Sequence, residues 1–357
     1  MIKKECFTAE WIEQVSSELH YNDKNLIEKV IRALSLLEML VKAGCPLVFK
    51  GGTALMLILG KSAHRLSIDI DLICPPGTNI EDYLKSFADF GFINLELLER
   101  KQRDDADIPK SHSKFFYQIA YRNDTDAQSY ILLDVLYEDI HYFRTQQIAI
   151  NCPFIRLEGK PLMVTVPSAE DILGDKLTAF APNTTGIPYY RNGRSCSMEI
   201  AKQLYDVGRL FENVSDLQIT KEAFRKIAVV ELSYRSFGTD IGQVFNDIRQ
   251  TALCISTRGK AGEGDFDLIQ DGIIRVKSFM YKQRYLIDHA IIDAARAAYL
   301  ATLIEKGINE IESYSNNPAD IKDMVIRPSL PNKLNKLRSN LPEAYYYWAK
   351  TSELLEA

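Results

Sequence analysis

The chain has 357 residues, of which 46% are hydrophobic and 25% are charged, and its formal net charge is −5. This balance is typical of a globular protein that is long enough to bury a large core in two domains or in one elaborated domain. The net negative charge excludes a protein that coats nucleic acid over its whole surface, although a local basic groove remains compatible with it.

The N-terminal residues and the cysteines predict a cytoplasmic protein. The first residues, Met-Ile-Lys-Lys-Glu-Cys, lead into charged sequence rather than into the apolar core of a secretory signal. No stretch is long and apolar enough to span a bilayer, so no membrane partner is expected. Six cysteines are scattered without a C-x-x-C pair, which predicts reduced thiols in a cytoplasmic protein.

The first notable unit is a glycine turn that follows a predicted helix at residues 25–42. A short apolar run ends at Lys50 and is followed by Gly51, Gly52 and Thr53, and then by an apolar helix at residues 54–59. Glycines allow close approach of the backbone, and the start of a helix offers free N–H groups. Such a turn can hold an anion, for example a phosphate.

An acidic strand is predicted next, at residues 66–74. Isoleucine and leucine alternate there with Ser67, Asp69 and Asp71. Residues two apart in a strand share a face, so the two carboxylates project together. Neighbouring carboxylates repel each other unless a cation lies between them, and hard oxygen ligands suit Mg²⁺ or Mn²⁺.

A helix at residues 79–90 and strands at 92–98, 114–121 and 130–137 complete a small mixed sheet with flanking helices. Asp134 is the one carboxylate in the apolar run 131–136, where a buried charge needs a partner. Asp134 could face solvent on an edge strand or pair with a nearby Lys or Arg.

Two candidate residues lie on later helices. A strand at 163–166 leads to a helix at about 168–180 that carries Lys176, and a further helix at 198–211 carries Asp206. Between them, residues 182–195 form a loop that could cover a substrate. A helical lysine is usually solvated, and Asp206 could simply pair with Lys202 or Arg209 at helical spacing.

From about residue 213 onward helical periodicity dominates, at 221–232, 242–253, 265–287 and 290–306. Asp265 and Asp267 repeat the D-x-D spacing, but they open a helix and are interpreted as a cap and a solvated first turn. The basic stretch 321–340 and the aromatic cluster 345–348 suit either single-stranded RNA or a helix that packs its aromatic face on the core. The predicted domains are residues 1–165 and 166–357.

The K-G-G-T-A-L and R-L-S-I-D-I-D segments, at residues 50–55 and 65–71, together resemble the signature of polymerase-β-type nucleotidyltransferases. Their form is similar to that of the AbiEii/AbiGii toxin family of type IV toxin–antitoxin systems, to which the MenT toxins also belong. The resemblance implies an α+β fold, a mixed sheet with flanking helices followed by a mostly helical C-terminal domain. It also implies transfer of an NMP from an NTP to an acceptor hydroxyl, at the 3′ end of tRNA in the best-understood members, and a cognate antitoxin.

The resemblance also implies residue roles. Asp69 and Asp71, with Asp134 as a third carboxylate, would hold Mg²⁺ or Mn²⁺, Lys176 would face the nucleotide, and Asp206 would take the proton from the attacking hydroxyl. The helical domain would thus contribute Lys176 and Asp206 to the active-site cleft. The residues expected to bind the NTP are Lys50, Gly51, Gly52, Thr53, Arg65 and Ser67. One departure from the family pattern is Gln203, which stands where an acidic residue is common.

Two alternatives remain open from the sequence. An enzyme of the same fold could modify a protein or a small molecule instead of RNA. A chain with a decayed site could be an inactive binding module, although the presence of both carboxylates and both glycines argues against decay.

Overall fold

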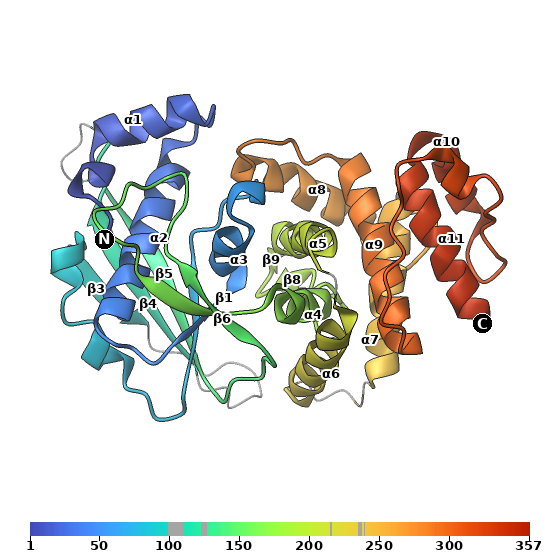
Figure 1. Cartoon of the computed structure of the whole chain (residues 1–357), viewed down its shortest axis with the longest axis horizontal. Helices are drawn as coiled ribbons and strands as arrows, with labels where there is room; N and C mark the ends of the chain where they lie inside the picture. The colour runs from blue at the N-terminus through green and yellow to red at the C-terminus, as the bar shows by residue number, and fades with distance from the viewer. Residues whose placement is uncertain (99–109, 123–126, 215, 235–237, 239) are drawn as a thin grey trace. The chain divides into compact units, whose positions relative to one another are not determined.

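The computed structural model describes residues 1–98, 110–122, 127–214, 216–234, 238 and 240–357 (Figure 1). The chain divides into two compact units. The first comprises Met1–Ser168 together with Ser278–Arg284, and the second comprises Ala169–Lys277 together with Tyr285–Ala357. The chain therefore leaves the first unit at residue 168 and returns to it once.

The first unit is built around a mixed sheet. Its helices are η1 (Lys4–Phe7), α1 (Ala9–Glu18), α2 (Lys24–Lys42), α3 (Gly51–Leu59), η2 (Gly60–Ser62), η3 (Ile80–Tyr83) and η4 (Phe87–Phe90). Its strands are β1 (Val48–Lys50), β2 (Ile70–Cys74), β3 (Asn94–Leu98), β4 (Lys110–Gln118), β5 (Gln128–Tyr137), β6 (Thr145–Ala149) and β7 (Met163–Pro167). Among the described residues, a five-stranded sheet has the order β1-β2-β5-β4-β3, with β2 and β5 parallel and the other neighbours antiparallel.

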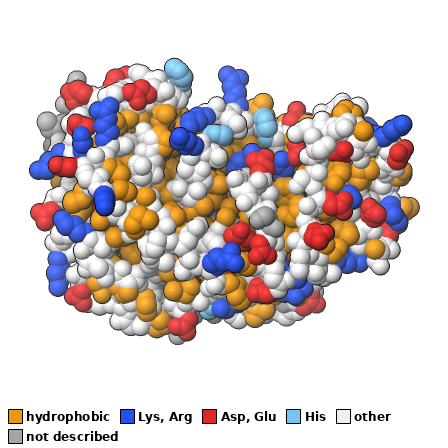
Figure 2. Space-filling view, in the orientation of Figure 1, with side chains coloured by type: hydrophobic (Ala, Val, Ile, Leu, Met, Phe, Trp, Pro, Cys, Tyr) orange, Lys and Arg blue, Asp and Glu red, His pale blue; other side chains and the backbone are white. Residues whose placement is uncertain are grey.

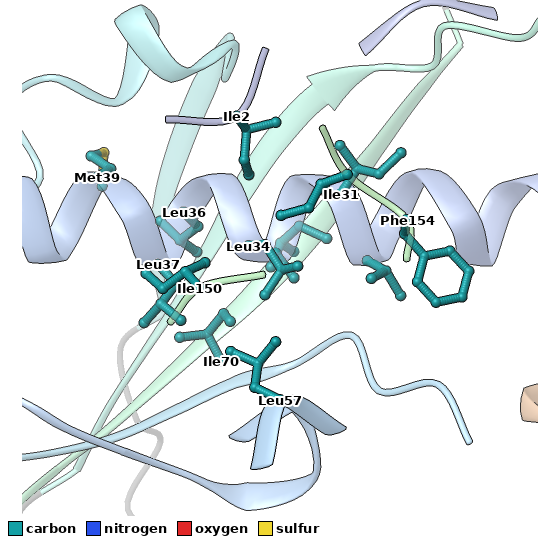
Figure 3. Close-up of a cluster of buried hydrophobic side chains, with 14 of the residues drawn as sticks. Ile2, Ile31, Leu34, Leu36, Leu37, Met39, Leu57, Ile70, Ile150 and Phe154 are labelled. Atoms are coloured by element: carbon teal, nitrogen blue, oxygen red, sulfur yellow. The ribbon is translucent and has the colours of Figure 1, made fainter. Parts of the chain in front are cut away.

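The long helix α2 forms the main apolar contact with this sheet. It begins after Asp23, whose side chain accepts a hydrogen bond from the backbone N–H of Leu26, a typical N-cap. Figure 3 shows Leu34 and Leu37 of this helix pointing toward Ile70, which in turn lies next to Leu57 of α3. Because these side chains are buried, one face of β2 is turned toward the core. Asp71 alternates with the buried residues of that strand and therefore lies on the opposite face.

The returning segment Ser278–Arg284 packs on the residues that precede β2. The backbone N–H of Leu66 donates to the carbonyl of Phe279 at 2.8 Å, and Arg65 and Met280 form an antiparallel bridge. Tyr281 is buried and meets Phe154 edge to face, with ring centroids 5.2 Å apart. The sequence prediction of one helix over 265–287 is therefore wrong, because the aromatic residues of this segment are buried against the first unit.

The second unit is mainly helical. Its helices are α4 (Ala169–Ala179), α5 (Ser197–Phe211), α6 (Leu217–Ser233), α7 (Ile241–Ser256), α8 (Phe266–Val276), η5 (Lys277–Phe279), which extends into the returning segment, α9 (Ile287–Lys306), η6 (Pro318–Ile321), η7 (Asn332–Lys336), α10 (Leu337–Asn340) and α11 (Pro342–Glu356). Strands β8 (Tyr190–Arg191) and β9 (Arg194–Ser195) form a hairpin within the predicted loop 182–195.

The aromatic cluster of α11 belongs to the core of this unit. Tyr345, Tyr347 and Trp348 are buried, and the indole N–H of Trp348 donates to the hydroxyl of Ser256 at 2.9 Å. This outcome confirms the core-packing interpretation of the cluster. Asp265 caps α8 by accepting a hydrogen bond from Leu268, so the second D-x-D is a helix start, as expected.

The mixed sheet with flanking helices and the helical C-terminal region confirm the predicted fold class. Two further local predictions are wrong. Residues 79–90 form two short 3₁₀ helices instead of one α-helix, and the acidic strand begins at Ile70, one residue after Asp69. Within the described residues, no helix is long and apolar enough to cross a membrane.

Candidate active site

The glycine turn lies directly against the acidic strand. Gly51 begins α3 with a φ angle of +77°, and a Cβ atom built on it would lie 2.0 Å from Oδ2 of Asp71. A Cβ atom on Gly52 would lie 2.7 Å from Oγ of Ser67 and 2.9 Å from Nη2 of Arg65. Any side chain at either position would occupy the space of these groups. The two sequence segments of the predicted signature are thus joined in space through backbone that has no side chain.

Thr53 and Asp69 make a second link between the turn and the strand. The hydroxyl of Thr53, which is buried, donates to the backbone carbonyl of Asp69 at 2.7 Å. Asp69 and Asp71 are half-buried and alternate with the buried residues Ile70 and Leu72. The alternation turns the two apolar side chains into the core and leaves the carboxylates on the other face.

A row of polar residues crosses the sheet at the level of Asp71. In the strand registers, Lys50 pairs with Asp71, Asp71 with Asp134, and Asp134 with His112. Residues in register on neighbouring strands project to the same face of a sheet. The structure therefore brings Asp134, which the sequence analysis placed only on a nearby strand, beside Asp71.

His112 is a residue that the sequence analysis missed. Its Nδ1 atom lies 2.6 Å from Oδ1 of Asp134, and both side chains are about one-third exposed, at 35% and 38%. The partner of Asp134 is thus a histidine, where the sequence analysis considered only Lys or Arg. The sequence pattern could not reveal His112, because this residue lies outside the predicted strand 114–121. Only the longer observed strand β4 brings it into register with Asp134.

Both the side chain and the main chain of Arg65 bond to backbone atoms of the first unit. It is 7% exposed, and its Nη1 atom donates to the carbonyl of Leu66 at 3.0 Å. The antiparallel bridge to Met280 holds its main chain. The guanidinium is consequently presented to the glycine turn in one defined position, with Nη2 next to Gly52.

Lys176 and Asp206, the two candidates in the second unit, contact each other. Nζ of Lys176 lies 3.1 Å from Oδ2 of Asp206, and the side chains are 10% and 2% exposed. The same Nζ donates to Oε1 of Gln203 at 3.0 Å. The sequence analysis considered Lys202 or Arg209 as partners of Asp206, but Arg209 instead pairs with Glu212 and Asp293.

The donor set at the strand suits a hard divalent ion. Carboxylate oxygens are preferred by Mg²⁺ and Mn²⁺, and Mg²⁺ commonly uses one or two carboxylates while water and phosphate oxygens fill its remaining positions. Asp69 and Asp71 supply two carboxylates of this kind, and their role as metal ligands stays a prediction. Over the part of the chain that the structure describes, no three His, Cys, Asp or Glu side chains are grouped closely enough to hold a metal ion by themselves. The metal role of Asp134 therefore stays a prediction.

Comparison with known proteins agrees with this geometry. The family model described as nucleotidyl transferase AbiEii toxin, type IV TA system, matches residues 34–319. This range includes the glycine turn, the acidic strand, Lys176 and Asp206. No curated protein matches the chain.

Three solved structures are similar to the chain. JHP933 from Helicobacter pylori is 15% identical, with 86% of this chain and 95% of that chain covered and a TM-score of 0.40. A putative nucleotidyltransferase from H. pylori is 17% identical, with 80% and 95% covered and a TM-score of 0.37. MenT4, a nucleotidyltransferase toxin from Mycobacterium tuberculosis, is 14% identical, with 82% and 89% covered and a TM-score of 0.40.

Proposed function

This chain belongs to the AbiEii nucleotidyl transferase toxin family of type IV toxin–antitoxin systems, and we propose that it transfers an NMP from an NTP to the 3′ end of a tRNA. The observation that carries the proposal is the contact between the Gly51 turn and the carboxylate of Asp71. A phosphate cradle and a divalent-ion ligand that touch each other are what nucleotidyl transfer requires.

The residues of the first unit bind and orient the triphosphate in this proposal. The backbone N–H groups at the start of α3 hold phosphate oxygens, and Ser67 and Arg65, which lie against Gly52, supply a hydroxyl and a cation to the same group. Lys50 adds a cation from β1, in register with Asp71. Mg²⁺ or Mn²⁺ on Asp69 and Asp71, with Asp134 as a further ligand, supplies charge neutralisation at the α-phosphate and the leaving pyrophosphate when it is bound.

Lys176 and Asp206 act as a pair in this proposal. Lys176 contributes its ammonium to the triphosphate, and Asp206 orients that ammonium by an ion pair of 3.1 Å. Because Asp206 is buried and pairs with Lys176, we propose that it positions this ammonium in addition to its predicted role as proton acceptor. Gln203 supports the same ammonium without adding charge.

A cytoplasmic location and a cognate antitoxin belong to the same proposal. The family description names a type IV toxin–antitoxin system, in which the toxin's activity is held in check by its partner. NTPs and tRNA are both cytoplasmic substrates.

The test is a transfer assay with each of the four labelled NTPs, with Mg²⁺ or Mn²⁺, and with total tRNA or total cell protein as acceptor. The proposal expects label on tRNA, and it expects Asp71→Asn to lower the rate by a factor of about 1000 or more, since the ion's contribution is several kcal/mol. If only protein becomes labelled, the acceptor is a protein and the proposed transfer to tRNA is wrong.

A matched control is available in the same chain. Asp267 is exposed and has the same D-x-D spacing to Asp265, but it opens a helix. Asp267→Asn removes the same chemical group and should leave transfer unchanged. Equal losses in Asp71→Asn and Asp267→Asn would refute the assignment of the acidic strand.

A further inference from the structure

The second unit contains a cavity of about 620 Å³ that the proposed chemistry does not use. It lies among the C-terminal end of α7, the start of α9, and the segment formed by η7 and α10. Its charged lining consists of Arg258, Lys260, Lys333, Lys336 and Asp288. Residues more than 70 positions apart in the sequence therefore bring their charges to one concave surface.

The charge of this cavity opposes that of the chain. Four cationic side chains face one carboxylate, whereas the whole chain has a net charge of −5. On the face shown in Figure 2, Lys and Arg side chains are mixed with Asp and Glu. A local excess of positive charge in a concave site focuses the potential and attracts anions.

The cations of the basic stretch 321–340 are used in two different ways. Arg327 pairs with Glu356, and Arg338 donates to the carbonyls of residues 321 and 322 and lies over the ring of Tyr345. These two arginines serve the local structure. Lys333 and Lys336 instead line the cavity.

Within the cavity, two of the three lysines have side chains that form neither an ion pair nor a hydrogen bond with the described residues. Arg258 pairs with Asp288 at 2.9 Å, and Nζ of Lys333 donates to the backbone carbonyl of Lys260 at 2.5 Å. Among the described residues, the exposed side chains of Lys260 and Lys336 form no ion pair. They are the side chains most readily available to an incoming anion.

The floor of the cavity offers little for direct hydrogen bonding. Two lining hydroxyls already bond within the protein: that of Ser256 accepts from the indole N–H of Trp348, and that of Thr257 accepts from the backbone N–H of Ala261 and lies 2.9 Å from the carbonyls of residues 253 and 261. The buried side chains of Ile291 and Leu337 complete the floor. A ligand is therefore recognised by charge at the rim and by shape at the floor, which suits a sugar–phosphate backbone better than a base edge.

We propose that this cavity binds the phosphodiester backbone of the RNA acceptor, an inference that rests on the proposed function and assigns the acceptor a binding surface. Three of its four cations are lysines, a residue type that is depleted at protein–protein interfaces, whereas interfaces with nucleic acid are strongly positive. The chemistry of the lining thus favours RNA over a protein partner.

The experiment measures binding of fluorescently labelled bulk tRNA to the full chain, without NTP, at several salt concentrations. The test variant is Lys260→Glu with Lys336→Glu, which spares the residues that bond to the protein itself. Loss of two phosphate contacts should weaken binding about tenfold or more and make the slope of log K against log salt shallower by about 2. The matched control is Lys306→Glu with Lys322→Glu, two exposed lysines of the same unit outside the cavity, which should retain the wild-type slope.

Three results would overturn the inference. The test variant could bind tRNA as wild type does, the control could lose binding equally, or the test variant could lose its antitoxin while it keeps tRNA, which would make the cavity a protein interface. Failure of the proposed function is distinguishable from all three. If the proposed function itself fails, the wild-type protein transfers no label to tRNA. Binding of tRNA and of NTP is measured in separate assays, so this failure can be told apart from the three results above.

Discussion

Two groups of carboxylates, one in each unit, have different surroundings. In the first unit, Asp71 lies against a glycine and in register with Asp134, another carboxylate. In the second unit, Asp206 and Asp293 each lie within 3.3 Å of a cationic nitrogen, and both are buried. Asp71 and Asp134 in the first unit lie in register beside the glycine turn, whereas Asp206 and Asp293 in the second unit are each paired with cationic side chains.

This difference separates ligand binding from internal support. A group of carboxylates at a sheet face costs stability and is useful when an ion and a phosphate complete it. A buried carboxylate between two guanidinium groups is already paired within the protein. Its removal leaves the positive charge of those groups less compensated. Variants of the first kind should change activity, and variants of the second kind should change stability.

The largest expected effect on stability is at Asp293, whose Oδ1 atom lies 3.2 Å from Nη2 of Arg209 and 3.3 Å from Nη1 of Arg296. Asp293→Ala should lower the free energy of unfolding by about 3 kcal/mol or more, measured by urea denaturation, because Arg209 and the buried Arg296 lose the partner that they share and keep only Glu212 and Glu343. Asp288→Ala breaks the exposed pair with Arg258 and should cost about 1 kcal/mol or less. Equal costs would remove the distinction between buried and exposed pairs.

The next effect is on activity, at Gly51. Gly51→Ala places a methyl group where Oδ2 of Asp71 lies, so the carboxylate must move, and a displacement of about 1 Å can cost about 100-fold in rate. Gly44 has the same φ angle of +77° but no atom within 4 Å of the added Cβ. Gly44→Ala therefore introduces the same backbone strain without the clash, and steady-state transfer rates should separate the two variants.

The ion pair of Lys176 and Asp206 allows a double-mutant cycle. Lys176→Met and Asp206→Asn should each destabilise the protein by about 3 kcal/mol, and the double variant should cost less than their sum by about 1–3 kcal/mol. Thermal and urea unfolding of the four proteins would measure this coupling. Additive costs would show that the two side chains do not support each other, and the positioning role of Asp206 would fall with that result.

The smallest expected effect is a pH dependence at Asp247. Burial raises the pKa of this carboxyl, although hydrogen bonds from Asn183, Thr184 and Thr251 act in the lowering direction. Between the usual carboxyl pKa of about 4 and the raised value, the folded state binds more protons than the unfolded state, so the free energy of unfolding falls as pH rises. Asp247→Asn should flatten that slope in denaturation curves between pH 4 and 7, and an unchanged slope would contradict it.

The sequence predicted those parts of the fold and site that depend on local pattern. Alternating apolar and acidic residues placed Asp71 on a strand with buried neighbours, and the double glycine predicted a helix start. These patterns succeed because strand and helix periods are set by a few adjacent residues.

The parts that the sequence could not predict depend on contacts between distant segments. His112 enters the polar row only through the register of β4 on β5, and the partner of Asp206 is thirty positions away on another helix. The burial of Tyr281 overrides the helical periodicity of its segment, since tertiary packing outweighs weak local preference.

The path of the chain has a consequence for its synthesis. Residues 63–66, which include Arg65, are held by the segment Ser278–Arg284, and that segment follows the first stretch of the second unit, residues 169–277. A nascent chain that emerges from the ribosome in order therefore completes the first unit only after this stretch has been made. Translation arrested before residue 278 would yield a polypeptide in which residues 63–66, beside the glycine turn, lack the segment that holds Arg65 in position.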